Sequence, residues 1–201
     1  MEMVEMGIVE KMNGIFKNVM NNNQEWCTDH LLEIINETLH MASEIMKRQY
    51  DKGGQGAVMS SQEKQAPQMI FDSFLMNFEY FIVLLGASDV TIIEKAAQNI
   101  LAFIHFSMVQ GIVRNDLLCI REDQLDYILP AFKTDKTSIC KSLIKAIYWA
   151  LSLNKNALAP SQDNAKKIMK ISEKLLASED KSLTNTAREV IKLCKNIMQQ
   201  S

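Results

Sequence analysis

Three stretches of the sequence share one helical pattern and one starting residue. They are DVTIIEKAAQNILAFI, DKTSICKSLIKAIYWA and DKSLTNTAREVIKLCK, which begin at Asp89, Asp135 and Asp180. The starting residues are 46 and 45 positions apart. A fixed period of this size predicts an array of stacked structural units. An aspartate beside a first helical turn accepts free backbone N–H groups, so each copy is predicted to begin at a helix cap.

Two stripes within each copy predict how the units pack. The residue seven positions after each aspartate is small, Ala96, Ser142 or Ala187, which allows a neighbouring helix to approach closely. A second stripe is mostly apolar in the first two copies. In the last copy its residues are Thr184, Arg188, Lys192 and Lys195. Since a terminal repeat has no following neighbour and needs a polar outer face, we predict a capping repeat at about residues 162–201.

The rest of the chain also has helical spacing. We predict about eight helices and no strand, within one domain over residues 1–201, because apolar residues recur at intervals of three and four. The chain has only 7 Gly and 3 Pro, few for a sheet protein that needs many turns. Residues 50–67 are rich in Gly, Ser and Gln and have no period, so they are predicted to form a flexible loop.

The segment IYWALSLN at 147–154 resembles the third-helix pattern of the armadillo/HEAT-like helical-repeat superfamily. Trp149, Ala150, Leu151 and Ser152 match that pattern, whereas Leu153 occupies the place of the family's asparagine. The resemblance covers roughly residues 68–201. It implies an all-α fold, an armadillo/HEAT-like right-handed α-solenoid of about four helix pairs. In the family the asparagine commonly clamps the backbone of an extended peptide.

This architecture predicts a non-enzymatic protein–protein interaction module or scaffold. A peptide or helix of a partner would dock on the concave surface formed by the second helix of each pair. The predicted contacts are Asn99, Phe103, Lys145, Trp149 and Ser152. Trp149 also lies in register with Phe103 on the apolar stripe, so packing in the core stays the other interpretation of this residue. The small size suggests a fragment of a larger protein.

Charge is unevenly distributed along the chain. Residues 1–129 hold 9 basic and 18 acidic residues, a net charge of −9, whereas residues 130–201 hold 13 basic and 6 acidic residues, a net charge of +7. A self-associating structural module, either charge-polar and head to tail or a homodimer, is therefore an alternative function. Nucleic acid is not an expected partner, because acidic residues interleave the basic ones in residues 163–201 and aromatic residues are absent there.

A helical-bundle metalloenzyme is the second alternative. His30, Glu37 and His40 fall on one helix face, and Glu37-x-x-His40 has the spacing of carboxylate-bridged di-iron bundles. Such a site needs a second E-x-x-H, and the chain has none. The chain also lacks a Gly-x-Ser-x-Gly motif and a Gly-rich phosphate loop. We therefore expect no catalytic residue, no metal and no cofactor.

The sequence also bears on location. The N-terminus lacks the basic start and apolar run of a signal peptide. No stretch reaches the roughly 18 continuous apolar residues of a membrane span. The cysteines are scattered and form no C-x-x-C pair: Cys27, Cys119, Cys140 and Cys194. We therefore expect reduced thiols in a cytoplasmic or nuclear protein that does not bind a membrane.

Overall fold

The computed structural model describes four stretches of the chain and a few positions outside them. The stretches are 25–53, 78–109, 120–154 and 162–200, and the other positions are 72, 75 and seven residues before residue 20. Every regular element in these stretches is a helix, and none is a strand. The all-α prediction is therefore confirmed for this part of the chain.

Six helices have defined bounds. They are α3 (Glu25–Gly53), α5 (Val90–Val109), α6 (Glu122–Ala131), α7 (Thr137–Leu153), α8 (Gln162–Leu175) and α9 (Lys181–Gln200). Residues 78–84 are also helical and end in a turn at Gly86. Because α3 continues to Gly53, the first four residues of the loop predicted at 50–67 are helical instead. The rest of that loop lies outside the described residues.

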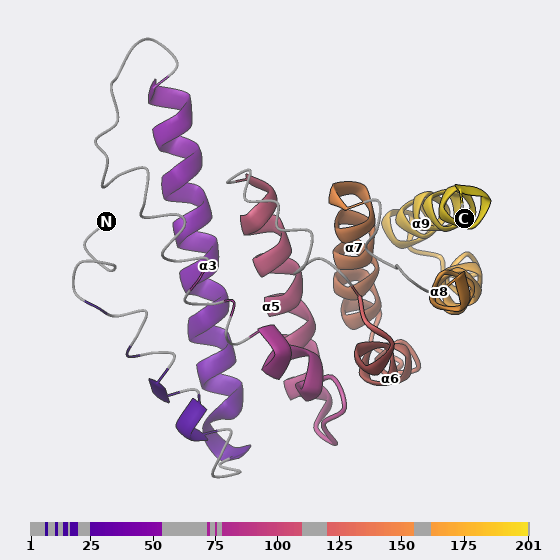
Figure 1. Ribbon diagram of the computed structural model, residues 1–201. Helices are drawn as coiled ribbons and strands as arrows, with labels where there is room; N and C mark the ends of the chain where they lie inside the picture. Colours follow the sequence, from indigo (N-terminus) through magenta and orange to yellow (C-terminus); the bar gives the residue numbers. More distant parts are fainter. Residues whose placement is uncertain are drawn as a thin grey trace.

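The helices form two rows (Figure 1). In the first row α3 packs against α5, α5 against α7, and α7 against α9. The three stretches with the shared pattern thus form α5, α7 and α9, which are consecutive neighbours. In the second row α6 packs against α7 and α8, and α8 packs against α9. A helix pair made of α8 and α9 therefore ends the described part of the chain.

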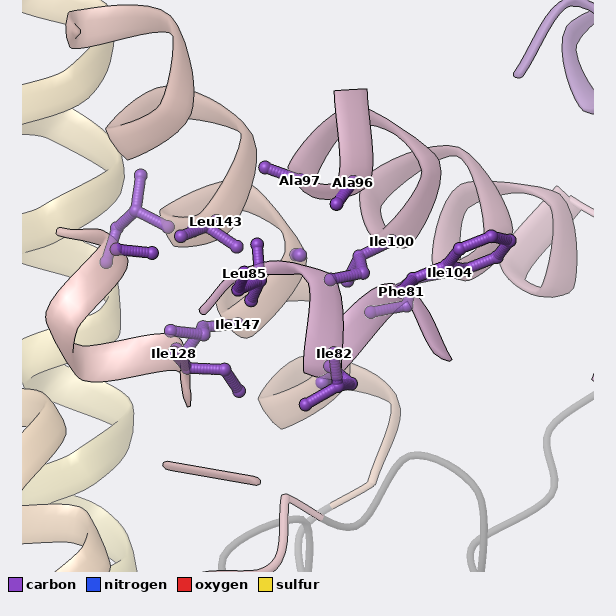
Figure 2. Packing of buried hydrophobic residues seen from close by; sticks show 14 of the residues in the cluster. Phe81, Ile82, Leu85, Ala96, Ala97, Ile100, Ile104, Ile128, Leu143 and Ile147 are labelled. Atoms are coloured by element: carbon purple, nitrogen blue, oxygen red, sulfur yellow. The ribbon is translucent and has the colours of Figure 1, made fainter. Parts of the chain in front are cut away.

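The core lies between the two rows (Figure 2). Phe81, Ile82 and Leu85 approach it from residues 78–85, and apolar side chains of α5, α6 and α7 meet them there. The three small residues of the shared pattern are buried, with exposed fractions of 0% for Ala96 and Ala187 and 8% for Ser142. Small side chains at these positions permit close contact between neighbouring helices, as the pattern predicted.

Two of the three predicted aspartate caps are present. Asp89 Oδ1 accepts the Thr91 N–H at 2.7 Å, and Asp180 Oδ1 accepts the Leu183 N–H at 3.0 Å. Asp135 does not cap α7, because α7 begins at Thr137 and Lys136, not Asp135, occupies the N-cap position. The backbone there is extended at Lys136, so the prediction was wrong for the middle copy.

The outer face of α9 is polar. Arg188, Lys192 and Lys195 are exposed, as a capping helix requires. Thr184 differs from the prediction, since only 8% of its surface is exposed. Its hydroxyl donates to the Lys181 carbonyl at 3.1 Å, which satisfies the buried oxygen within the helix itself.

Ion pairs join each helix of the first row to the next. The pairs are Lys95–Glu33 between α5 and α3, Lys136–Glu94 between α7 and α5, and Lys141–Asp180 between α7 and the start of α9. Pairs with this degree of exposure stabilise a fold by about 0–1 kcal/mol each. Their consequence is mainly to favour one register between neighbouring helices.

The pair between Lys141 and Asp180 predicts a pH dependence. The Lys141 ammonium, with the Leu183 N–H, lowers the pKa of the Asp180 carboxyl below its ordinary value. The charged form therefore stabilises the fold above about pH 4, and this contribution is lost as the pH falls through the lowered pKa. Asp180→Asn keeps a cap acceptor, so we expect it to lower the Tm near pH 6 and to match the wild type near pH 2.

Thermal unfolding followed by circular dichroism across this pH range measures the difference. Asp163→Asn is the control, because Asp163 pairs with Lys166 inside the same helix, α8. A Tm difference for Asp180→Asn that is the same at both ends of the pH range would contradict the assignment.

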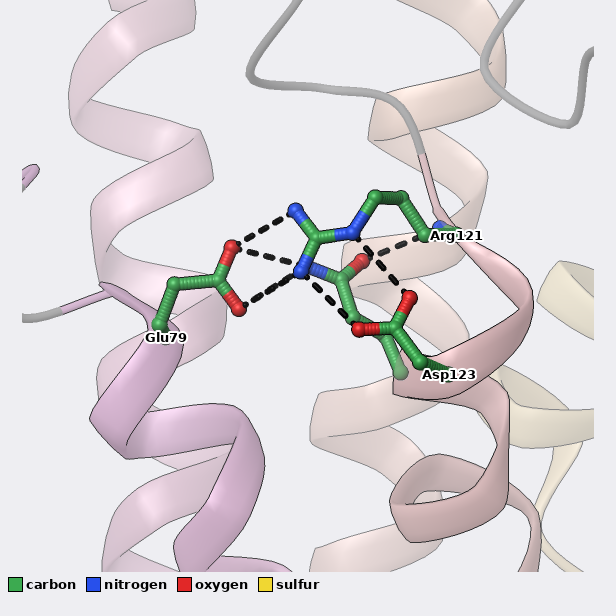
Figure 3. Close-up of polar contacts among 4 residues, drawn as sticks. Glu79, Arg121 and Asp123 are labelled. Carbon is green, nitrogen blue, oxygen red and sulfur yellow. Dashed lines mark hydrogen bonds and ion pairs between the residues drawn. The ribbon is translucent and has the colours of Figure 1, made fainter.

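A polar cluster links residues 78–84 to the start of α6 (Figure 3). Arg121 donates to both oxygens of Glu79, at 2.8 and 3.0 Å, and also to Asp123. The Arg121 guanidinium lowers the pKa of the Asp123 carboxyl, and both carboxylates raise the pKa of Arg121. The Gln124 side chain accepts a hydrogen bond from the backbone N–H of Arg121 and donates one to the Glu79 carboxylate. The cluster thus positions the first turn of α6 against the helical residues 78–84.

Candidate functional site

A groove of about 680 Å³ crosses all four helices of the first row. Neighbouring packed helices lie about 10 Å apart, so four of them span about 30 Å. The groove is lined by Asn36 and His40 of α3, Gln98, Leu101, Ala102 and His105 of α5, Lys145, Tyr148 and Trp149 of α7, and Thr186 of α9. We call this surface the four-helix groove. It is large enough to hold a ligand of several residues.

Helix α7 supplies the most distinctive side chains of the groove. Lys145, Tyr148 and Trp149 are spaced by three and four, which places them on one face of the helix. The opposite face carries buried residues such as Leu143 and Ile147, which hold α7 in the core. Burial of one face therefore determines which side chains reach the groove.

Tyr148 and Trp149 form an aromatic pair at the groove wall. Their ring centroids are 5.0 Å apart at an interplanar angle of 61°, an edge-to-face arrangement. Both rings are half-buried and pack partly against the core. Trp149 therefore satisfies both sequence interpretations, since one part of its ring contacts the core and another part lines the groove.

Lys145 is the only lysine, arginine, aspartate or glutamate among the described lining residues. It is half-buried, and no carboxylate of the described residues forms an ion pair with it. The other polar groups of the described lining are two imidazoles, two carboxamides, two hydroxyls and one indole N–H, which belong to His40, His105, Asn36, Gln98, Thr186, Tyr148 and Trp149. The described lining thus combines one ammonium, an aromatic wall and several neutral donors.

The structure brings two of the five predicted contact residues to this groove, Lys145 and Trp149. Ser152 is exposed near the end of α7, where its hydroxyl donates to the Tyr148 carbonyl at 2.7 Å, and it does not line the groove. Asn99 and Phe103 are buried, with exposed fractions of 0% and 1%. The prediction of a partner contact was wrong for these two residues, because a buried side chain cannot contact a docked partner.

Asn99 and Phe103 instead hold α5 in place. Asn99 Nδ2 donates to the Leu32 carbonyl of α3 at 2.8 Å and to the Lys95 carbonyl at 2.9 Å. The Phe103 ring lies 5.0 Å from the Phe78 ring, measured between centroids. Periodicity could not separate these positions from the groove positions, because the apolar band of α5 covers most of its circumference.

The contact residues predicted from the sequence did not include Tyr148 of α7 or the lining residues of α3, α5 and α9. Tyr148 carried a usable signal, since it is a large aromatic residue three positions after Lys145. Gln98, Leu101 and His105 carried a weaker one, because their spacing of three and four defines a second face of α5. Thr186 carried none, since a threonine on a polar helix is unremarkable.

The face proposed for a metalloenzyme lies on the outside of α3. His30, Glu37 and His40 are all exposed. In the described part of the chain, no three His, Cys, Asp or Glu side chains come close enough together to hold a metal ion. His40 contributes to the four-helix groove instead.

Cys140 of α7 and Cys194 of α9 are free thiols. Cys140 and Cys194 are buried, with exposed fractions of 6% and 0%. Burial raises the pKa of both thiols, that of Cys194 to about 12. A thiol that stays protonated is a weak nucleophile, so these residues act as small apolar side chains of the core.

A second, smaller cavity lies inside the core and is almost entirely apolar. It is enclosed by side chains of residues 78–82, α5, α6 and α7, among them Ile100, Ile128 and Ile147. Its volume of about 30 Å³ is small, on the scale of a single water molecule. The cavity is therefore a packing gap between the two rows.

No family model matches the chain, and no curated protein or solved structure matches it either. Within the described residues, no helix combines the length and the hydrophobicity that a membrane crossing requires.

Proposed function

We propose that the protein is a non-enzymatic interaction module that docks a segment of another protein in the four-helix groove. The two rows of helices would then be a short armadillo/HEAT-like right-handed solenoid, with α3, α5, α7 and α9 along its inner surface. Support comes from the period of 46 and 45 residues, the order in which α5, α7 and α9 pack, and the polar outer face of α9. A cytoplasmic or nuclear location fits this role.

One observation carries the proposal: Trp149, Tyr148 and Lys145 lie together, half-buried, in a groove that crosses four helices. Tryptophan and tyrosine are enriched among residues that dominate binding energy, because they bury a large area and keep a polar atom at the edge. Half-buried aromatic side chains of this kind lose little conformational freedom when a partner covers them. The groove thus offers an anchor of the type that protein interfaces use.

The dimensions of the groove indicate the kind of segment that fits. An extended chain covers about 30 Å in about nine residues, and a helix needs about 20 residues for the same distance. A segment of either form could contact all four helices. Alternating side chains of an extended segment, or one face of a helix, would reach the aromatic wall.

The test is to pan a random peptide library of this length against the purified chain and to measure the affinity of enriched peptides by fluorescence anisotropy. We expect Trp149→Ala to weaken these peptides at least about thirtyfold, the effect of losing about 2 kcal/mol at a hot spot. Gln98→Phe, which enlarges a half-buried side chain in the groove without adding a charge, should also weaken binding.

Tyr127→Ala is the matched control, because Tyr127 is an aromatic residue of α6 with 39% of its surface exposed outside the groove. Circular dichroism shows whether each variant keeps its helix content. If the enriched peptides bind Trp149→Ala and Gln98→Phe as tightly as the wild type, the groove is not the docking surface.

A further inference from the structure

We infer that the four-helix groove selects acidic segments, in which a carboxylate pairs with Lys145 and a neighbouring apolar side chain packs on Trp149 and Tyr148. This inference rests on the proposed function and adds the chemical class of the partner. It follows from three features of the groove: the charge of its lining, the partial burial of its one ammonium, and the direction in which charge changes across the row of helices.

The described lining offers positive charge and hydrogen-bond donors without a carboxylate. The Lys145 ammonium carries three donors and no acceptor, whereas the carboxamides of Asn36 and Gln98 can both donate and accept. An acidic side chain or a free carboxyl terminus accepts hydrogen bonds only, so it complements the ammonium. A basic segment would bring like charges together in a partly dehydrated groove.

Partial burial makes the charge of Lys145 selective. An ion pair on an open surface contributes little, because water screens both charges. Lys145 is half-buried between aromatic and aliphatic groups, where the effective dielectric constant is lower and the attraction to a carboxylate is stronger. Covering this ammonium without giving it a partner would be unfavourable, so a docked segment without a carboxylate is disfavoured.

Charge changes sign across the groove. At its α3 edge, Glu37 and Glu44 are exposed one turn to either side of the lining residue His40. Lys145 lies on α7, two helices further along the row. The acidic part of a bound segment is therefore expected over α7, with any basic residues toward α3.

The experiment compares peptides selected from the library by the wild type with those selected by Lys145→Glu. We expect the wild type to enrich peptides with net negative charge, and Lys145→Glu to bind those peptides at least tenfold less tightly and to enrich neutral or basic peptides instead. Lys145→Gln should weaken the acidic peptides by a smaller factor. Added salt should weaken their binding to the wild type more than their binding to Lys145→Gln.

Lys170→Glu is the matched control, since Lys170 is an exposed lysine of α8 in the other row of helices. It changes the net charge equally and should leave the affinity of acidic peptides within twofold of the wild type. If Lys170→Glu weakens them as much as Lys145→Glu does, net charge explains the effect and the inference is wrong.

The possible failures are distinguishable. If Trp149→Ala weakens the enriched peptides but these are neutral or basic, or bind Lys145→Glu unchanged, the groove is a docking surface and acidic selection is wrong. If no enriched peptide depends on Trp149, Gln98 or Lys145, the proposed function fails and this inference fails with it.

Discussion

Phe103→Ala is expected to lower the free energy of unfolding by about 3–5 kcal/mol. The Phe103 ring is 1% exposed and lies 5.0 Å from the Phe78 ring, between α5 and the helical segment at residues 78–84. Its removal takes away buried apolar contacts and leaves a cavity that the packed helices can close only partly. Urea unfolding followed by circular dichroism measures the change.

Val83→Ala is the control for this prediction. Val83 belongs to the same packing region but has 46% of its surface exposed, so its truncation should cost less than about 1 kcal/mol. A cost for Phe103→Ala no larger than that of Val83→Ala would show that Phe103 does not pack in the core. In that case the sequence prediction of Phe103 as a partner contact would regain its basis.

The second large effect is expected at the buried face of α9. Ala187 is 0% exposed on α9, at the third small position of the shared pattern. Ala187→Asp would place an unpaired charge between tightly packed helices, and we expect it to lower the free energy of unfolding by at least about 3 kcal/mol. The same urea titration measures it, and loss of helix content in the α8–α9 pair would accompany it.

Its neighbour in the chain provides a sharp control. Arg188 is exposed on the outer face of α9 and contacts Asn185 within the same helix. Arg188→Asp introduces the same side chain one position later and should change stability by no more than about 0.5 kcal/mol. Equal effects at positions 187 and 188 would mean that α9 does not pack as a cap with one buried and one polar face.

The comparison of Ala187 with Arg188 depends on the geometry of the α-helix. One residue turns a helix by 100°, so adjacent positions such as Ala187 and Arg188 can have opposite environments. The alternation of apolar and polar residues along α9 made this orientation predictable. On α5 and α7 it was less predictable, because apolar residues surround most of each helix.

The sequence alone determined the helical character of the chain, the positions of α5, α7 and α9 and the polar outer face of α9. These features are local, since they depend on residue spacing and helix-forming tendency within a single segment. Only the tertiary structure decided that Asn99 and Phe103 are buried, that Thr184 lies inside, and that Lys145 and Trp149 line one groove with residues of three other helices. A helix that is apolar on several sides can face its neighbours in more than one way, and only packing against particular neighbours selects the side that remains open.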